Sequence, residues 1–328
     1  MHITMMPDQA TVRDLLRKIG MEVAENHIHQ VEGGTINSAF RIDQGKDASL
    51  ILRISPSDAE AEAGPCWLTS HGLRREQTTI GLLTEIEDLL PRTIHFDESR
   101  EFIDRDWVLQ TWIRGESWSD LRPGLTDDED MELWRELGRV TRKIHSIVGE
   151  EFGPPEAGLG YATWPDLIRW DVSGLSVDAH RYGIDREPFE ELQALVDQAM
   201  PVLDKITVPR LIHSDLGQRH VFIARGGDDR YGITGLIDFE FARFADQYSE
   251  SVFLDDALLP GQDSRDAALC EGYVCDRPTH DDQLRRQIYT LTSIGWAVTD
   301  MARTQQTKQI PAMLDRMRDL LQDARDMM

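Results

Sequence analysis

The sequence predicts an α+β protein of two lobes, a small strand-rich lobe followed by a larger helical lobe. Alternating apolar residues and turn signals fill the first third of the 328-residue chain, whereas helical spacing dominates from about residue 126 onwards. Only residues 208–239 interrupt the helical part with strand-like sequence. Because Ile113-Arg-Gly115 breaks the last strand of the first part, we place the boundary between residues 1–112 and 113–328.

The first lobe is expected to form an antiparallel sheet accompanied by two helices. A glycine-rich turn, Gly33-Gly-Thr-Ile-Asn37, separates its first two strands, and Pro91 ends its second helix. The expected elements, in chain order, are a helix at 11–23, strands at 27–32, 38–43 and 49–54, a helix at 72–89, and strands at 92–96 and 107–113.

The second lobe opens with a strong helix start and contains one embedded hairpin. Thr126-Asp-Asp-Glu129 is a capping box, in which hydroxyl and carboxylate satisfy helix amides reciprocally. The turn residues Gly226–Asp229 separate two β-rich runs, 220–225 and 231–237. Further helices are expected at 186–204, 265–273, 283–304 and 311–328.

Composition limits the classes of partner. The 35 basic and 59 acidic residues give a net charge of −24, which argues against nucleic-acid binding because that requires a cationic surface. The same charge would attract a cationic small molecule, although a solvated acidic surface that aids solubility is the simpler explanation.

The sequence also predicts a cytoplasmic location. We expect no membrane insertion and no export, because no stretch approaches the length of a membrane span and the N-terminal region lacks an apolar leader. Cys66, Cys270 and Cys275 form no CxxC pair, so they are expected to be reduced, structural thiols. Nothing in the sequence predicts the oligomeric state.

Two aspartates form the strongest chemical signal. Asp215 lies in a loop before the first hairpin strand, and Asp238 follows the second strand. A hairpin places the start of its first strand beside the end of its second, so His220 and Asp238 are expected to be neighbours, with Asp215 close by. Such a cluster can bind a metal and orient a nucleophile, as phosphoryl transfer requires.

Both segments resemble motifs of the aminoglycoside phosphotransferase family, which has a bilobal, protein-kinase-like fold. His213-Ser-Asp215-Leu-Gly-Gln-Arg-His220 resembles its H-x-D-x-x-x-x-N catalytic loop, and Ile237-Asp238-Phe-Glu240 resembles the segment that replaces D-F-G. The resemblance covers most of the chain in order. It implies that Asp215 is the catalytic base, that Asp238 is the principal Mg²⁺ ligand, and that ATP or GTP is the co-substrate.

The loop departs from the family pattern at one position, where His220 replaces the usual asparagine. Macrolide phosphotransferases resemble this chain in carrying histidine there. Three roles stay open for His220: a metal ligand, a phosphate contact, or packing at the start of the strand. The resemblance also implies that His213 braces the loop through a hydrogen bond, and that Asp246 accepts hydrogen bonds from the loop; a solvated loop acid is the alternative for Asp246.

The nucleotide site is expected in the first lobe. Backbone amides of the glycine-rich turn could cover phosphates, although GxGxxG is absent and any Gly-Gly hairpin looks alike. Arg53 resembles the family's phosphate-binding cation, with Glu76 as its acidic partner; two unrelated surface charges are the alternative. The backbone from Gln110 to Trp112 resembles the hinge that binds a purine, and an ordinary strand explains it equally. The residues expected in the turn are Gly34, Thr35, Asn37 and Ser38.

The predicted function is magnesium-dependent transfer of a phosphoryl group to a hydroxyl of a small molecule, such as an aminoglycoside or a macrolide antibiotic. A sugar or amino-alcohol kinase and a nucleotide-binding pseudokinase are the alternatives. A protein kinase fits less well, because the D-F-G glycine and an A-P-E-like segment are missing. Acids and aromatics that suit a cationic or ring-bearing acceptor are Asp255, Asp256, Glu271, Trp164, Trp170 and Tyr273.

Overall fold

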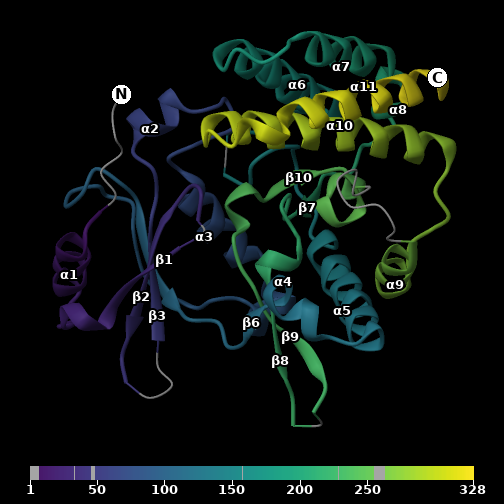
Figure 1. Cartoon of the computed structure of the whole chain (residues 1–328). Helices are drawn as coiled ribbons and strands as arrows, with labels where there is room; N and C mark the ends of the chain where they lie inside the picture. The colour runs from purple at the N-terminus through teal and green to yellow at the C-terminus, as the bar shows by residue number, and fades with distance from the viewer. Residues whose placement is uncertain (1–6, 33, 46–48, 157, 228, 255–262) are drawn as a thin grey trace.

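A computed structural model of the protein describes residues 7–32, 34–45, 49–156, 158–227, 229–254 and 263–328. A sheet with helix α1 (Gln9–Lys18) forms one side of the molecule, and helices form the other (Figure 1). The α+β fold with two lobes is therefore confirmed. The glycine Gly33 and the acceptor candidates Asp255 and Asp256 lie outside the described residues.

The N-terminal sheet has five antiparallel strands in the order β1-β2-β3-β5-β4. Alternation along β3 buries Leu50, Leu52 and Ile54 against α1, whereas Arg53 points to the opposite face. That face lies toward α3, so the two-residue period of the strand places Arg53 on the side of the sheet that faces this helix. The strands are β1 (Ile28–Val31), β2 (Ser38–Asp43), β3 (Ser49–Ile54), β4 (Thr93–Asp97) and β5 (Trp107–Thr111).

The connection between β3 and β4 differs from the expected single helix. A short helix, α2 (Asp58–Ala63), comes first, and a capping box of Ser57 and Glu60 starts it. The next helix, α3, spans only Gly72–Leu82, and a 3₁₀ segment, Thr84–Leu89, follows. The helix ends early because the buried side chains of Leu83 and Ile86 turn into the core of the second lobe.

The second lobe begins with β6 (Glu116–Ser117) and the short helix α4 (Trp118–Leu121). Thr126 and Glu129 cap α5 as expected. Helix α6 was not predicted, because its buried face carries Asp171 and Asp178 while Trp170 and Val177 are exposed, so hydropathy does not follow burial along it. The remaining helices are α5 (Asp127–His145), α6 (Trp164–Arg181), α7 (Glu187–Gln198), α8 (Met200–Leu203), α9 (Asp263–Tyr273), α10 (His280–Arg303) and α11 (Ile310–Asp326).

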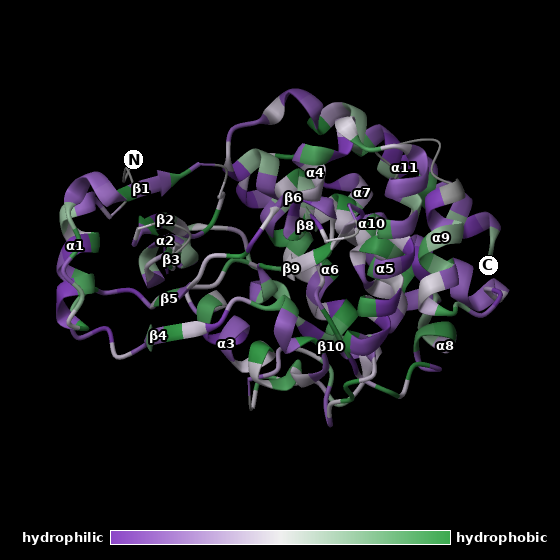
Figure 2. Cartoon of the chain, turned by 90° about the horizontal axis from the view of Figure 1, so that it is seen from below, coloured by the Kyte–Doolittle hydropathy of each residue, from purple (hydrophilic) through white to green (hydrophobic). Residues whose placement is uncertain are grey.

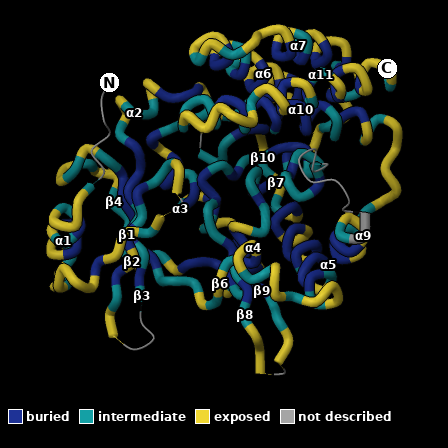
Figure 3. Tube along the Cα trace, viewed as in Figure 1, coloured by how far each residue is buried: buried dark blue, intermediate teal, exposed yellow. Residues whose placement is uncertain are grey.

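Two hydrophobic cores stabilise this lobe. Helices α6, α7, α10 and α11 bury one apolar cluster against one another, and α5, α9 and the β8–β9 hairpin share the second. Figure 3 shows dark buried stretches along α5 and the central strands, and Figure 2 shows apolar and polar residues alternating along the outer helices. No described helix is long and apolar enough to cross a membrane.

Short strands of the second lobe hold the loops that carry the two aspartates. Strand β7 (Arg210–Ile212) pairs with β10 (Arg243–Ala245), and β8 (Val221–Arg225) pairs with both β6 and β9 (Tyr231–Leu236). The amide of Ile237 donates to the carbonyl of His220 at 3.1 Å, so the open end of the hairpin joins both motifs.

One expectation about the cysteines is wrong. Cys270 and Cys275 are paired as a disulfide at the end of α9, and only Cys66 is a free thiol in the described part of the chain. The sequence did not predict this pairing, because the two cysteines are five positions apart and form no CxxC motif. The chain turns back on itself after Tyr273 and so brings Cys275 beside Cys270.

Candidate active site

The catalytic-loop candidate runs from β7 to β8, and His213 holds it in place. The ring of His213 is buried; its Nε2–H donates to the carbonyl of Ile237 at 2.9 Å, and its Nδ1 accepts from the amide of Asp215 at 3.3 Å. Ser214 has φ +72°, a left-handed conformation that glycine adopts more easily. The imidazole therefore links the two aspartate-bearing segments, as the supporting role predicted for it requires.

The Asp215 carboxylate projects from this loop and is about one-third exposed. The backbone carbonyl of Asp215 accepts a hydrogen bond from Nδ1 of His220 at 2.7 Å. This bond assigns the proton of the imidazole to Nδ1, so Nε2 is unprotonated and can accept. Nη2 of Arg219 donates to both carboxylate oxygens, at 2.7 and 2.9 Å. Sequence reasoning missed Arg219, although it lies within the quoted motif.

Asp238 lies where β9 ends, with φ +74° turning its side chain back toward the loop. Its Oδ1 accepts from Nη2 of Arg53 at 2.7 Å, and its Oδ2 lies 3.5 Å from Nε2 of His220. Burial opposes ionisation of Asp238, but the charge of Arg53 together with those of the nearby histidines and Arg219 outweighs it, so the pKa of Asp238 is lowered. Burial lowers the pKa of His220, which favours the neutral ring.

Arg53 and Glu76 form the ion pair that the sequence predicted. Nη1 of Arg53 lies 2.6 Å from both oxygens of Glu76, whose side chain is 1% exposed. The side-chain amide of Gln110 donates to the same carboxylate at 3.3 Å. Strand β3 and helix α3 thus fix a guanidinium that reaches Glu76 and Asp238 together, so the alternative of two unrelated surface charges is wrong.

The glycine-rich turn is joined to the segment after Asp238. Nδ2 of Asn37 donates to Oε2 of Glu240 at 2.8 Å, and the carbonyl of Thr35 accepts from Arg303 at 3.2 Å. Gly72, at the start of α3, leaves room for Glu240, because a Cβ there would lie 2.7 Å from Oε2. Gly34 approaches the carbonyl of Asn37 closely. Ser38 is buried at the start of β2.

Glu240 is a buried acid that sequence reasoning assigned no role. Burial, together with the nearby charge of Asp238, raises its pKa to about 8. Its position in the quoted Asp238-Phe-Glu240 segment was the available signal. The raised pKa means that the carboxyl group stays protonated through much of the neutral range.

Asp246 does not accept hydrogen bonds from the catalytic loop, so that prediction is wrong. Its carboxylate accepts from Arg285 at 3.0 Å and from the Tyr289 hydroxyl at 2.7 Å, both on α10. The buried acid that supports the loop is Glu250, which accepts from the amide of His213 at 2.6 Å. A turn places Glu250 there, and sequence spacing alone did not distinguish the two acids.

The predicted purine-binding backbone is partly committed to the sheet. The amide of Thr111 donates to the carbonyl of Arg92 at 3.0 Å, and that of Trp112 donates to Ser49 at 3.1 Å. Those two amide donors are therefore not available to a base, and binding of a purine by other backbone atoms of this segment stays a prediction. The side chain of Gln110 donates a hydrogen bond to the carboxylate of Glu76.

Most of the acceptor candidates have structural roles. Trp164 and Tyr273 are buried. The indole N–H of Trp164 donates to the hydroxyl of Tyr289, and the hydroxyl of Tyr273 is hydrogen-bonded to Nδ1 of His145. Glu271 pairs with Arg135 at 2.7 Å on the outside of α9. Trp170 is half exposed on α6 and remains a candidate.

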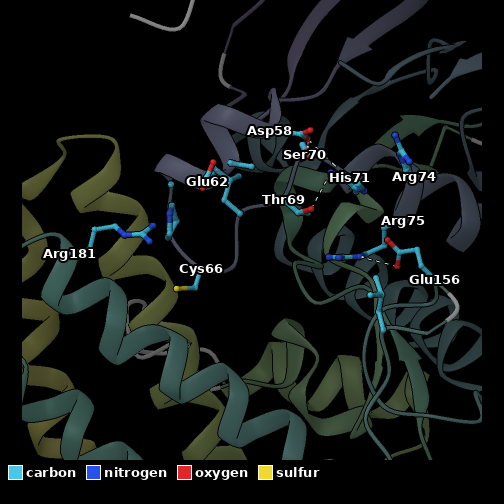
Figure 4. Close-up of a pocket in the computed structure, with 15 residues that line it drawn as sticks. Asp58, Glu62, Cys66, Thr69, Ser70, His71, Arg74, Arg75, Glu156 and Arg181 are labelled. Carbon is cyan, nitrogen blue, oxygen red and sulfur yellow. Dashed lines mark hydrogen bonds and ion pairs between the residues drawn. The ribbon is translucent and has the colours of Figure 1, made fainter. Parts of the chain in front are cut away.

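A cavity of about 610 Å³ lies next to the first turn of α3 (Figure 4). Cys66, His71 and Arg75 line it from the first lobe, and Glu156 and Arg181 line it from the second. Arg75 also donates to the carbonyl of Glu240 at 3.3 Å, so the cavity adjoins the segment that follows Asp238.

The side chains around Asp238 fit the way in which nucleotide-binding enzymes hold Mg²⁺. Within the described ranges no group of three or more His, Cys, Asp or Glu side chains forms a complete metal site. Mg²⁺ usually binds one or two protein carboxylates and takes its other ligands from phosphates and water. Oδ2 of Asp238, 3.5 Å from the unprotonated Nε2 of His220, meets that requirement.

Comparisons with known proteins agree with this geometry. Over 95% of this chain and 98% of the other, the fold matches a variant of aminoglycoside phosphotransferase APH(4)-Ia in complex with AMP-PNP and hygromycin B, with 18% identity and a TM-score of 0.67. Aminoglycoside 2'-phosphotransferase-IIIa with GDP matches 96% of this chain and 98% of its own, with 17% identity and a TM-score of 0.66. No curated protein matches. The model of the phosphotransferase enzyme family matches residues 27–284, and the chain therefore belongs to that family.

Proposed function

We propose that the protein transfers the γ-phosphoryl group of ATP or GTP to a hydroxyl group of a small molecule. The observation that carries this proposal is the convergence of Asp215, His220, Asp238 and Arg53 on one spot, from two lobes. A base, a metal-binding carboxylate and a cation for the phosphates are the parts that phosphoryl transfer needs.

Each residue takes a role that follows from its contacts. Asp215, on a loop braced by His213, orients the acceptor hydroxyl and accepts its proton. Arg53, held by Glu76, neutralises the phosphates that lie between the lobes. Asp238, with His220 beside it, would hold Mg²⁺, which would neutralise part of the phosphate charge. Residues 1–112 would carry the nucleotide and residues 113–328 the catalytic loop and acceptor.

The acceptor that we propose is a hydroxylated antibiotic, an aminoglycoside or a macrolide. The net charge of −24 favours a cationic molecule. The similar APH(4)-Ia structure holds hygromycin B, and His220 supports the macrolide option. A sugar or an amino alcohol is the alternative acceptor.

A phosphorylation screen tests this function. The purified protein is incubated with Mg²⁺, ATP or GTP, and panels of aminoglycosides, macrolides, sugars and amino alcohols. Mass spectrometry should detect one product heavier by a single phosphoryl group. The variant Asp215→Ala should lower turnover by about 10²- to 10⁴-fold while nucleotide binding persists.

The matched control is Asp120→Ala, an exposed acid on α4, which should leave turnover unchanged. Unchanged turnover in Asp215→Ala would contradict the assignment of the base. Nucleotide binding without transfer to any acceptor or to water would instead identify a nucleotide-binding pseudokinase.

A further inference from the structure

Arg219 occupies the acceptor atoms that the proposed reaction needs. Its Nη2 donates to both carboxylate oxygens of Asp215, at 2.7 and 2.9 Å. Its Nε donates to Nε2 of His220 at 3.2 Å. One guanidinium therefore covers the proposed base and the free nitrogen of the neighbouring imidazole at the same time.

This arrangement opposes phosphoryl transfer. The acceptor oxygen attacks the γ-phosphorus, the bond to the bridging oxygen breaks with its electron pair on the diphosphate, and the hydroxyl proton passes to Asp215. The hydroxyl must come within hydrogen-bond distance of the carboxylate, where the guanidinium of Arg219 now lies. A guanidinium on both oxygens also lowers the proton affinity of the carboxylate, so the proton passes to Asp215 more readily once Arg219 has turned away.

The side chain of Arg219 is free to turn. It is 66% exposed, and the described contacts bind its guanidinium only to Asp215 and His220. Its backbone is fixed, because the amide of His220 donates to Gly217 and the ring of His220 donates to Asp215. The charged end can therefore move while its attachment point stays beside the reacting groups.

The charges of the site indicate where the guanidinium goes. Asp215, Asp238 and Glu76 surround the site, and Arg53 already balances two of these carboxylates. Mg²⁺ and Arg53 would offset part of the charge of an entering triphosphate, and the guanidinium of Arg219 can offset more of it. A guanidinium binds phosphate oxygens bidentately and stays charged at all relevant pH values.

We propose that Arg219 is a catalytic residue that turns from Asp215 to the transferred phosphoryl group when the nucleotide binds. In this position it frees the base and stabilises the charge that spreads over the phosphoryl oxygens in the transition state. This inference rests on the proposed phosphoryl transfer by the same site. It gives Arg219 a role distinct from that of Arg53, which remains bound to Glu76 and Asp238.

The test compares Arg219→Ala and Arg219→Lys with the wild-type protein, using water as the acceptor. The readouts are Mg²⁺-dependent hydrolysis of ATP and GTP, and the affinity for ADP with and without aluminium fluoride, which mimics the transferred phosphoryl group. Arg219→Ala should slow hydrolysis by about 10²- to 10³-fold. It should lose the tighter binding that aluminium fluoride gives, while its affinity for ADP alone stays within about twofold.

Two further variants make the result specific. Arg219→Lys should recover part of the loss, because an ammonium keeps the charge but not the bidentate geometry. Arg225→Ala removes an exposed arginine that pairs with Glu129 at the end of β8, and it should match the wild-type protein in both readouts.

The inference is overturned if Arg219→Ala hydrolyses nucleotide as fast as the wild-type protein, or faster, and keeps the aluminium fluoride effect. Arg219 would then only cover the base. Failure of the proposed function looks different: the wild-type protein itself would bind neither nucleotide, or Asp215→Asn would hydrolyse nucleotide at the wild-type rate.

Discussion

Two arginine–aspartate pairs border the site, and they have the same length but different surroundings. Arg53 and Asp238 approach to 2.7 Å, as do Arg219 and Asp215. Arg53 is 12% exposed and Asp238 27%, whereas Arg219 is 66% exposed and Asp215 34%. Burial, and not distance, therefore separates a fixed part of the site from a part that can rearrange.

The surroundings decide what happens when a pair is broken. Arg53 is also bound by Glu76, which Gln110 contacts in turn, so losing one partner leaves a charge that water cannot reach. Asp215 and Arg219 can each exchange the other for water at small cost. Positioning of the nucleotide needs a pair that is costly to break, and entry of an acceptor needs a pair that can exchange its partner for water.

The largest expected effect is on the fixed pair. Glu76→Ala should lower the free energy of unfolding by about 3 to 5 kcal/mol, because it leaves the guanidinium of Arg53 with a single carboxylate in a buried setting. Denaturant unfolding followed by tryptophan fluorescence measures this. The control Glu87→Ala, on the exposed side of the following 3₁₀ segment, should change stability by less than about 0.5 kcal/mol. Equal effects in the two variants would show that the Arg53 pair is not the fixed part of the site.

A second pair of variants separates support of the catalytic loop from support of the fold. Glu250→Gln weakens the bond to the amide of His213 and should cost about 2 kcal/mol of stability and lower nucleotide hydrolysis. Asp246→Asn, which weakens bonds to Arg285 and Tyr289, should cost a similar amount but leave hydrolysis by the folded protein unchanged. Loss of hydrolysis in Asp246→Asn alone would restore the sequence-based assignment.

The pH dependence of stability tests the burial of Glu240. Its pKa rises from 4.5 to about 8 on folding, so the folded state holds a proton that the unfolded chain releases. The wild-type protein should therefore lose stability relative to Glu240→Gln as the pH rises from about 5 to 8, by at most about 1.4 kcal/mol per pH unit. Parallel stability curves for the two proteins, measured by thermal unfolding without Mg²⁺, would contradict the raised pKa.

Local patterns predicted most of the fold. The capping box at Thr126, the alternation along β3 and the turn between β8 and β9 each act over a few residues, and the structure contains all three. Tertiary packing decided the exceptions. The buried face of helix α6 includes Asp171 and Asp178, and Trp170 and Val177 lie exposed, so its hydropathy does not reveal the face that packs. The helix expected at 72–89 ends at Leu82, because Leu83 and Ile86 belong to another core.

The site divides in the same way. Asp215, His220 and Asp238 were predicted as neighbours because one hairpin joins them, and the distances agree. Partners brought together by longer connections could not be read from the sequence. Glu250, not Asp246, supports His213, and this depends on how the 3₁₀ turns after β10 fold back. The bond between Asn37 and Glu240 likewise depends on the approach of the two lobes.

The smallest expected effect concerns the exposed pair. Arg219→Ala should change the free energy of unfolding by less than about 1 kcal/mol, because both charges are partly solvated and water replaces the lost partner. Denaturant unfolding in low and high salt measures this, and salt should narrow the difference between variant and wild type. The variant must then stay folded while it loses hydrolysis, a combination that a structural residue does not give. A loss of stability as large as that of Glu76→Ala would remove the distinction between the two pairs, since Arg219 would then be a fixed part of the site that cannot turn toward a phosphoryl group.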